Sequence, residues 1–141
     1  MKALTIFLAL IFAQQFQAQT NNSATITVYV ENLDSNEGPV IFGLYTEINF
    51  MKAKPKFNVQ GEIVNGTARI TFEGITPGTY AISCFHDKNS NGQMDFEPTG
   101  KPLEPFGVSN NKINPNGTPQ WSDAKFEVSG SPLYFNIKLT R

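Results

Sequence analysis

Polar side chains of the kind that bind hard cations gather in one short segment of the chain, residues 87–97. Asp87, Asn89 and Asn91 occupy the first, third and fifth places of a D-x-[DN]-x-[DN]-G pattern, and Gly92 follows as its bend. Calcium takes six to eight oxygen ligands, and alternate residues of a tight loop can turn several of them inward. The segment therefore predicts a calcium site. Its candidate ligands are Asp87, Asn89, Asn91, the carbonyl group of Gln93, Asp95 and Glu97.

The segment departs from a standard calcium loop at the twelfth place, which is Pro98 and has no side-chain ligand. Glu97 stands one residue early, so either it bends inward, or Glu104 or Asp123 arrives from the following segment, or water completes the shell. With two certain carboxylates we expect a dissociation constant on the order of 10⁻⁴ to 10⁻³ M. The alternative is an Asx-rich turn whose side chains cap their own backbone and need no metal. The sequence leaves both open.

Catalytic groups are harder to assemble from this sequence. Cys84 and His86 share one face of a predicted strand but lie about 7 Å apart there, too far for proton transfer. We expect Cys84 to be a buried apolar residue, and His86 to hydrogen-bond the loop or to join the cation site. Asp95, Glu97 and Glu104 could converge for glycoside hydrolysis, but their spacing does not specify it. We therefore expect no enzyme and no catalytic residues, with a carboxylate-based hydrolase as a weaker alternative.

A second candidate binding region follows in residues 98–121, a long connection that contains five prolines. A connection of this length inside a small domain is either functional or an ordered excursion. Its aromatic and amide side chains could bind a glycan or a peptide without metal, although the single tryptophan could equally plug one end of the fold. The candidate ligand-binding residues are Phe106, Asn110, Asn111 and Trp121.

The polar segment must be positioned by the stretch before it, residues 79–86, which carries β-branched, aromatic and small residues on both alternating faces. This pattern is typical of a central strand that is covered on both sides. Turn signals at short spacing and the lack of a convincing helical pattern after the first residues predict an all-β fold. We expect one domain over residues 24–141, a single antiparallel β-sandwich of immunoglobulin or transthyretin size. Its seven or so strands are predicted at residues 24–31, 40–46, 57–64, 67–73, 79–86, 124–128 and 133–139.

The first eighteen residues have the pattern of a secretory signal peptide. Lys2 provides a positive start, an apolar run follows at residues 3–13, and Ala18 offers a small residue for cleavage. The apolar run is too short to span a bilayer. The sequence thus predicts an exported protein, periplasmic or extracellular, with no membrane span in its mature part. This location favours a non-catalytic binding or structural module of the cell envelope, with an envelope protein or a glycan as its partner.

Charge and cysteine content narrow the function further. Without Lys2 the chain has ten basic and twelve acidic residues, so it offers no strongly cationic surface and we expect no nucleic-acid partner. Cys84 is the only cysteine, which excludes an internal disulfide. The fold must therefore be stabilised by its apolar core, to which twelve phenylalanines contribute.

Three runs of the sequence resemble a known family. They are G-T-Y-A-I-S-C-F-H-D-K-N-S-N-G-Q-M-D at residues 78–95, G-K-P-L-E-P-F-G-V-S-N-N at 100–111, and P-Q-W-S-D-A-K-F at 119–126. With them the chain resembles the exported bacterial domain-of-unknown-function family 2141 (DUF2141) over residues 24–139. The resemblance implies an envelope or secreted location, a β-sandwich like transthyretin-like or carboxypeptidase-regulatory-like modules, and no established activity.

The same resemblance implies which positions matter, because the H-D-x-N-x-N-G-x-x-D and E-P-x-G-x-S-N-N segments are specific to the family. Val108 stands where an aromatic residue is expected and Trp121 where phenylalanine is expected, so packing detail is in doubt more than the site. The positions carried over are His86, Asp87, Asn89, Asn91, Gly92, Asp95, Glu104, Pro105, Gly107, Ser109, Asn110 and Asn111.

Overall fold

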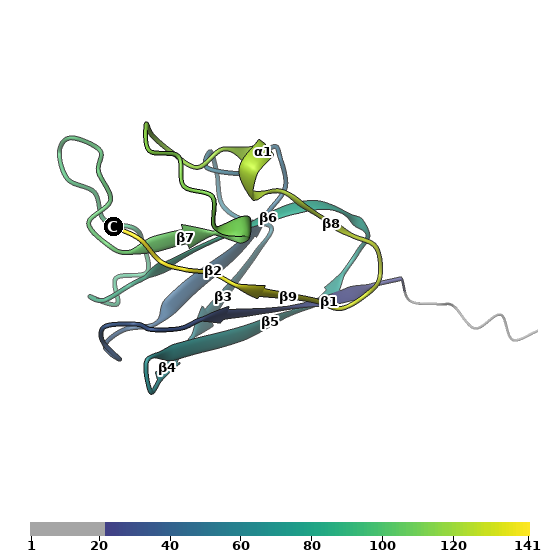
Figure 1. Ribbon diagram of the computed structural model, residues 1–141, viewed down its shortest axis with the longest axis horizontal. Helices are drawn as coiled ribbons and strands as arrows, with labels where there is room; N and C mark the ends of the chain where they lie inside the picture. The colour runs from purple at the N-terminus through teal and green to yellow at the C-terminus, as the bar shows by residue number, and fades with distance from the viewer. Residues whose placement is uncertain (1–21) are drawn as a thin grey trace, which may run out of the picture.

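The computed structural model describes residues 22–141, which form two β-sheets and two very short helices (Figure 1). The first sheet has the strand order β4 (Ile63–Val64), β5 (Thr67–Ile75), β1 (Ala24–Val30) and β9 (Leu133–Asn136). The second has the order β3 (Phe57–Gly61), β2 (Val40–Tyr45), β6 (Gly78–His86) and β7 (Phe106–Val108), with β8 (Phe126–Val128) paired to the first residues of β6. The helices are η1 (Ser109–Asn111) and α1 (Trp121–Ala124). The predicted signal peptide, residues 1–18, lies outside the described residues.

The two sheets share one apolar core. The alternating residues of β1 point into it, as the sequence pattern requires, and Ile26 and Val28 are fully buried. From the second sheet, Phe42 and Leu44 of β2 and Ile82 of β6 fill the same core and are also fully buried. Each such side chain contributes about 1.5–3 kcal/mol relative to an exposed position. The core therefore holds β6 rigidly, and β6 carries the polar segment at its end.

The prediction of a mostly β chain is confirmed, but the expected count of about seven strands is wrong. The stretch predicted as one strand at 57–64 is divided between the sheets, since β3 pairs with β2 while β4 pairs with β5. The chain changes sheets at Glu62, between β3 and β4, and the turn at Asn65 and Gly66, with φ angles of 51° and 73°, then folds β4 directly back onto β5. The additional strand β7 lies in the long connection, where only a short apolar patch marked it.

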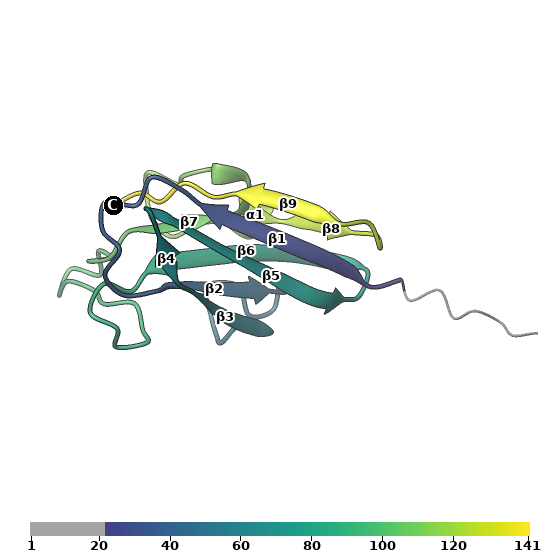
Figure 2. The same ribbon diagram turned by 90° about the horizontal axis from the view of Figure 1, so that it is seen from below.

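The expectation of a purely antiparallel arrangement is wrong at one pair of strands. β9 lies parallel to β1, with Ile26 opposite Leu133 and Tyr29 opposite Asn136. The preceding strand, β8, belongs to β6 of the other sheet, so the chain crosses between sheets before it enters β9. Figure 2 shows β1 between β5 and β9. A crossing of this kind leaves no signal in the alternation of apolar residues.

The last part of the chain also differs from the prediction, because it contains a short helix, α1, before its strands. The strand expected at 124–128 begins only at Phe126, and Ala124 ends α1, a single turn closed by the bond from Lys125 N–H to the Trp121 carbonyl. Trp121 packs edge-on to Phe50 with ring centroids 5.8 Å apart, over a small second cluster that also contains Ala124. Burial of this aromatic pair favours the turn over an extended strand. Within residues 22–141, no helix has the length and apolar character needed to cross a membrane.

Candidate functional site

The polar segment begins where β6 ends. His86 is fully buried and Asp87 is 1% exposed, because backbone groups on both sides hold them. His86 N–H donates to the Pro105 carbonyl and Asp87 N–H to the Pro39 carbonyl, each at 2.9 Å. Gly38 lies against Asp87 with φ of +69°, and a Cβ at Gly38 would collide with the Asp87 carbonyl oxygen. The first residue of the loop therefore has a fixed backbone position.

The loop itself is folded by its own side chains. Asp87 Oδ1 accepts from Asn91 N–H at 3.2 Å, and Asp87 Oδ2 accepts from Gly92 N–H at 2.8 Å. Asn89 Oδ1 accepts from Asn91 N–H at 3.3 Å, and Asn91 Oδ1 accepts from Gln93 N–H at 3.1 Å. These are the contacts of an Asx-rich turn. The turn is thus formed without any further ligand.

The Asp95 carboxylate accepts hydrogen bonds from the side-chain amides of that turn. Asn89 Nδ2 donates to Asp95 Oδ2 at 2.8 Å, and Asn91 Nδ2 donates to Asp95 Oδ1 at 3.0 Å. The amide NH₂ groups thus face the carboxylate, while the amide oxygens are used by backbone N–H groups. For these amides to bind a cation, their side chains must turn over so that oxygen replaces nitrogen beside Asp95.

Glu104 reaches the same place from the early part of the long connection, two residues before β7. It is 6% exposed, its Oε2 accepts from Asp95 N–H at 3.2 Å, and its Oε1 has no hydrogen-bond partner among residues 22–141. Burial raises the pKa of Glu104, and the negative charges of Asp95 and Asp87 and the side-chain contact with the Asp87 carboxyl group act in the same direction, against the lowering effect of the Asp95 N–H. The sequence offered Glu104 as one of several candidates for completing the shell of calcium ligands. It could not single Glu104 out, because the tertiary fold decides which side chain lies beside Asp95.

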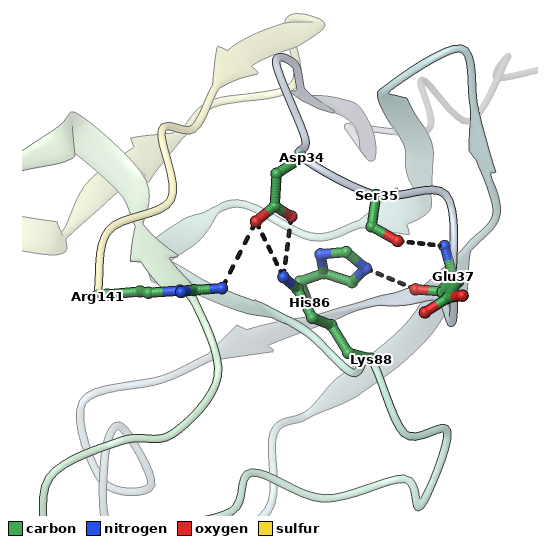
Figure 3. A network of polar contacts seen from close by, with 6 residues as sticks. All are labelled: Asp34, Ser35, Glu37, His86, Lys88 and Arg141. Carbon is green, nitrogen blue, oxygen red and sulfur yellow. Dashed lines mark hydrogen bonds and ion pairs between the residues drawn. The ribbon is translucent and has the colours of Figure 1, made fainter.

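The carboxyl groups of Asp87, Asp95 and Glu104 have no ion-pair partner among the described residues. The ion pairs in this part of the chain join Lys88 and Arg141 to Asp34, at 2.9 and 3.5 Å, and Lys112 to Asp123. Figure 3 shows Lys88 and Arg141 converging on Asp34. As the side chains stand, residues 22–141 present no group of three His, Cys, Asp or Glu residues arranged to hold a metal ion. A cation would have to draw these carboxylates closer together.

The remaining predicted metal ligands lie at the edge of this cluster. Residues 95–103 form a small hairpin, with Leu103 N–H bonded to the Asp95 carbonyl and an isolated bridge between Phe96 and Pro102. Glu97 lies in this hairpin, where its Oε2 accepts from the Thr99 hydroxyl at 3.2 Å. Gln93 is exposed. The structure therefore groups Asp87, Asn89, Asn91 and Asp95 with Glu104, and leaves the Glu97 side chain bonded to its own hairpin.

His86 and Cys84 are both fully buried in the interior. His86 Nε2 lies 2.7 Å from the Glu37 carbonyl oxygen, so Nε2 carries the hydrogen and donates it (Figure 3). Cys84 is fully buried, as the sequence predicted, and burial raises the pKa of its thiol far above the usual range. A protonated, buried thiol is a poor nucleophile.

The residues of the second predicted binding region do not line one cavity. Phe106 and Asn111 border a cavity of about 280 Å³. Asn110 instead bonds the carbonyl groups of Asp123 and Lys125 through Nδ2, at 2.9 and 3.0 Å. Trp121 is half-buried against the second apolar cluster.

The fold and the site together define a two-sheet, mostly β protein with an acidic and amide-rich loop at the end of a central strand. Residues 28–135 match the family described as "Uncharacterized protein conserved in bacteria (DUF2141)", so the chain belongs to that family. Comparison with curated proteins and with solved structures gives no match.

Proposed function

We propose that the protein is a non-catalytic binding or structural module of the bacterial cell envelope whose 87–97 loop binds calcium. It is exported through the leader at residues 1–18 and folds as a transthyretin-like or carboxypeptidase-regulatory-like β-sandwich. The shared core of the two sheets supports the sandwich architecture. Burial of the only cysteine and the bond from His86 to Glu37 support a non-catalytic role.

The observation that carries the calcium proposal is the buried, partly unpartnered carboxyl group of Glu104 beside two further carboxylates. A buried carboxylate without a counter-charge is unfavourable, and like charges close by make it more so. No lysine, arginine or histidine among the described residues forms an ion pair with Glu104, Asp87 or Asp95. A divalent cation between them would compensate the charge and give the free Glu104 oxygen a partner.

The proposed ligands are Asp87, Asn89, Asn91, Asp95, the carbonyl group of Gln93, and Glu104. Glu104 supplies the carboxylate ligand that Pro98, at the twelfth place of the pattern, cannot supply. The two amides bind after turning over, so that their oxygens face the ion. This releases the N–H groups of Asn91 and Gln93 from the amide oxygens, while the bond from Gly92 N–H to Asp87 Oδ2 still holds the bend. Three carboxylates with amide and carbonyl oxygens suit the weak sites of extracellular modules, with a dissociation constant on the order of 10⁻⁴ to 10⁻³ M.

The test is a calorimetric titration of the chelator-treated protein with calcium, alongside thermal unfolding. We expect saturable binding, and at calcium ten times the dissociation constant the free energy of unfolding should rise by about 1.4 kcal/mol. Glu104→Gln should weaken binding at least tenfold, since the side chain keeps its size and loses its charge. Glu97→Gln is the matched control and should bind as the wild type does.

Two results would count against the proposal. A titration without heat, together with identical melting in calcium and in chelator, would leave the loop as a metal-free Asx-rich turn. Loss of binding in Glu97→Gln but not in Glu104→Gln would show that the loop binds calcium with a different carboxylate.

A further inference from the structure

We propose a second binding site, independent of the calcium site, for a small monocarboxylate with an apolar body. It is the cavity of about 280 Å³ that lies between β7, the segment 112–119 and the final segment 138–140. The chain leaves β7 through η1 into the segment 112–119, while the final segment runs beside β7 (Figure 1). With about 30 Å³ for each water-sized group, the cavity has room for a ligand of roughly nine non-hydrogen atoms.

The floor of the cavity is fixed. Phe106 N–H donates to the Thr140 carbonyl at 2.9 Å, and Thr140 N–H donates to the Phe106 carbonyl at 2.8 Å. At Gly107 the two segments touch, because a Cβ there would lie 2.6 Å from the Lys138 carbonyl oxygen. A preformed cavity avoids much of the ordering cost of binding.

The walls are mainly apolar, and the polar amides among them are already used. Phe106, Ile113, Pro119 and Leu139 line the cavity. Asn111 donates through Nδ2 to the Asn136 carbonyl, and its Oδ1 accepts from Lys138 N–H, both at 2.9 Å. A sugar would need several free donors and acceptors around it, so this lining favours a ligand with an apolar body.

The charge of the lining selects a carboxylate. Lys112 and Lys138 are the only charged residues that line the cavity. Lys138 forms no ion pair with a described residue, and Lys112 lies 3.6 Å from an Asp123 carboxylate oxygen with its side chain 63% exposed. The Asp123 carboxylate offsets part of the charge of Lys112, so Lys138 is the cavity lysine without a counter-charge among the described residues. An apolar cavity with two lysines and no acidic residue complements one negative charge on an apolar body.

The probe for this site is octanoate, with octan-1-ol as the uncharged ligand of the same chain length. In calorimetry or NMR titrations we expect saturable octanoate binding, at least tenfold tighter than octanol binding. Lys138→Gln and Lys112→Gln should each weaken octanoate binding about two- to fivefold, and the double variant should bring it to the level of octanol. Both lysines are exposed, so these variants should fold.

The control variant is Lys125→Gln, an exposed lysine outside the cavity, which should bind octanoate as the wild type does. All titrations are repeated in chelator, where the octanoate affinity should be unchanged, so failure of the calcium proposal does not affect this test. Equal binding of octanoate and octanol, an equal loss in Lys125→Gln, or no saturable octanoate binding would each overturn the inference.

Discussion

Glu104 Oε2 accepts a hydrogen bond from the backbone N–H of Asp95 at 3.2 Å. This contact joins the end of the polar loop to the segment that leads into β7. It brings a third carboxyl group to a place where two others already lie. The stability of the protein should therefore respond to charge, protons and packing at this point in ways that can be measured.

The pH dependence of stability follows from the raised pKa of Glu104. Its folded-state pKa lies above the ordinary value of 4.5, so between these values the folded protein binds more protons than the unfolded chain. The contribution of Glu104 to the free energy of unfolding is full below about pH 4.5, falls as the pH rises through the raised pKa, and is lost above it. Urea unfolding in chelator should show this fall in the wild type but not in Glu104→Gln.

Calcium should remove the fall in stability of the wild type with rising pH, since a bound cation favours the ionised carboxyl group of Glu104. The wild type would then keep its stability as the pH rises. If Glu104→Gln and the wild type have parallel pH profiles in chelator, the fold does not raise the pKa of Glu104.

Asp87 should be the most sensitive side chain of the loop. Asp87→Ala leaves the N–H of Gly92 without its acceptor and the N–H of Asn91 with only the 3.3 Å bond to Asn89 Oδ1, so it should lower the free energy of unfolding by about 2 kcal/mol. Asp87→Asn keeps one acceptor oxygen and should cost about half as much. Asp123→Ala removes only an exposed carboxylate and should change stability by less than about 0.5 kcal/mol. Equal effects of the two alanine variants in urea unfolding would contradict the assigned role.

Gly38 and Gly100 form a matched pair for the backbone that holds Asp87. Both have positive φ, +69° and +86°, so an alanine costs about 1 kcal/mol or slightly more at either position. Only at Gly38 would the new Cβ meet another atom, the Asp87 carbonyl oxygen, whereas Gly100 faces open space. Chemical denaturation should therefore show a clearly larger loss for Gly38→Ala. The same loss at both positions would mean that Asp87 can move aside.

Trp121 should act as a packing residue. Trp121→Ala should lower the free energy of unfolding by about 2 kcal/mol, and Trp121→Phe by less than about 1 kcal/mol, because phenylalanine keeps an aromatic contact with Phe50. A double-mutant cycle with Phe50→Ala should give a coupling of about 0.5–1.5 kcal/mol. Unchanged stability in Trp121→Ala would instead favour a role for this ring in binding a glycan or a peptide.

Local patterns predicted those parts of the fold that depend on neighbouring residues. Alternating apolar residues at 24–31 indicate β1, apolar and small residues on both faces at 79–86 indicate β6, and Asn65 and Gly66 form a pair typical of hairpin turns, as the structure has them. Contacts between distant segments were not predictable in this way. The parallel pairing of β9 and the division of 57–64 between two sheets arise only when both sheets assemble.

The cluster at Asp95 shows the same limit. The pattern named Asp87, Asn89, Asn91 and Asp95 from their spacing. It placed Glu97 with them and left Glu104, Asp123 or water as alternatives for completing the shell. One signal was present, since Pro98, Thr99 and Gly100 are turn-forming residues that fold the chain back on itself. Reading them as a hairpin places Leu103 opposite Asp95, and Glu104 then follows beside the cluster.

The parallel pairing of β1 with β9 also has a mechanical consequence. The two strands point the same way, so a force pulling Ala24 and Asn136 apart acts along both strands in opposite directions. Such a force loads the hydrogen bonds between them in shear, and they must break together rather than one after another. A domain tethered at both ends in a cell wall or between two partners would resist extension for this reason.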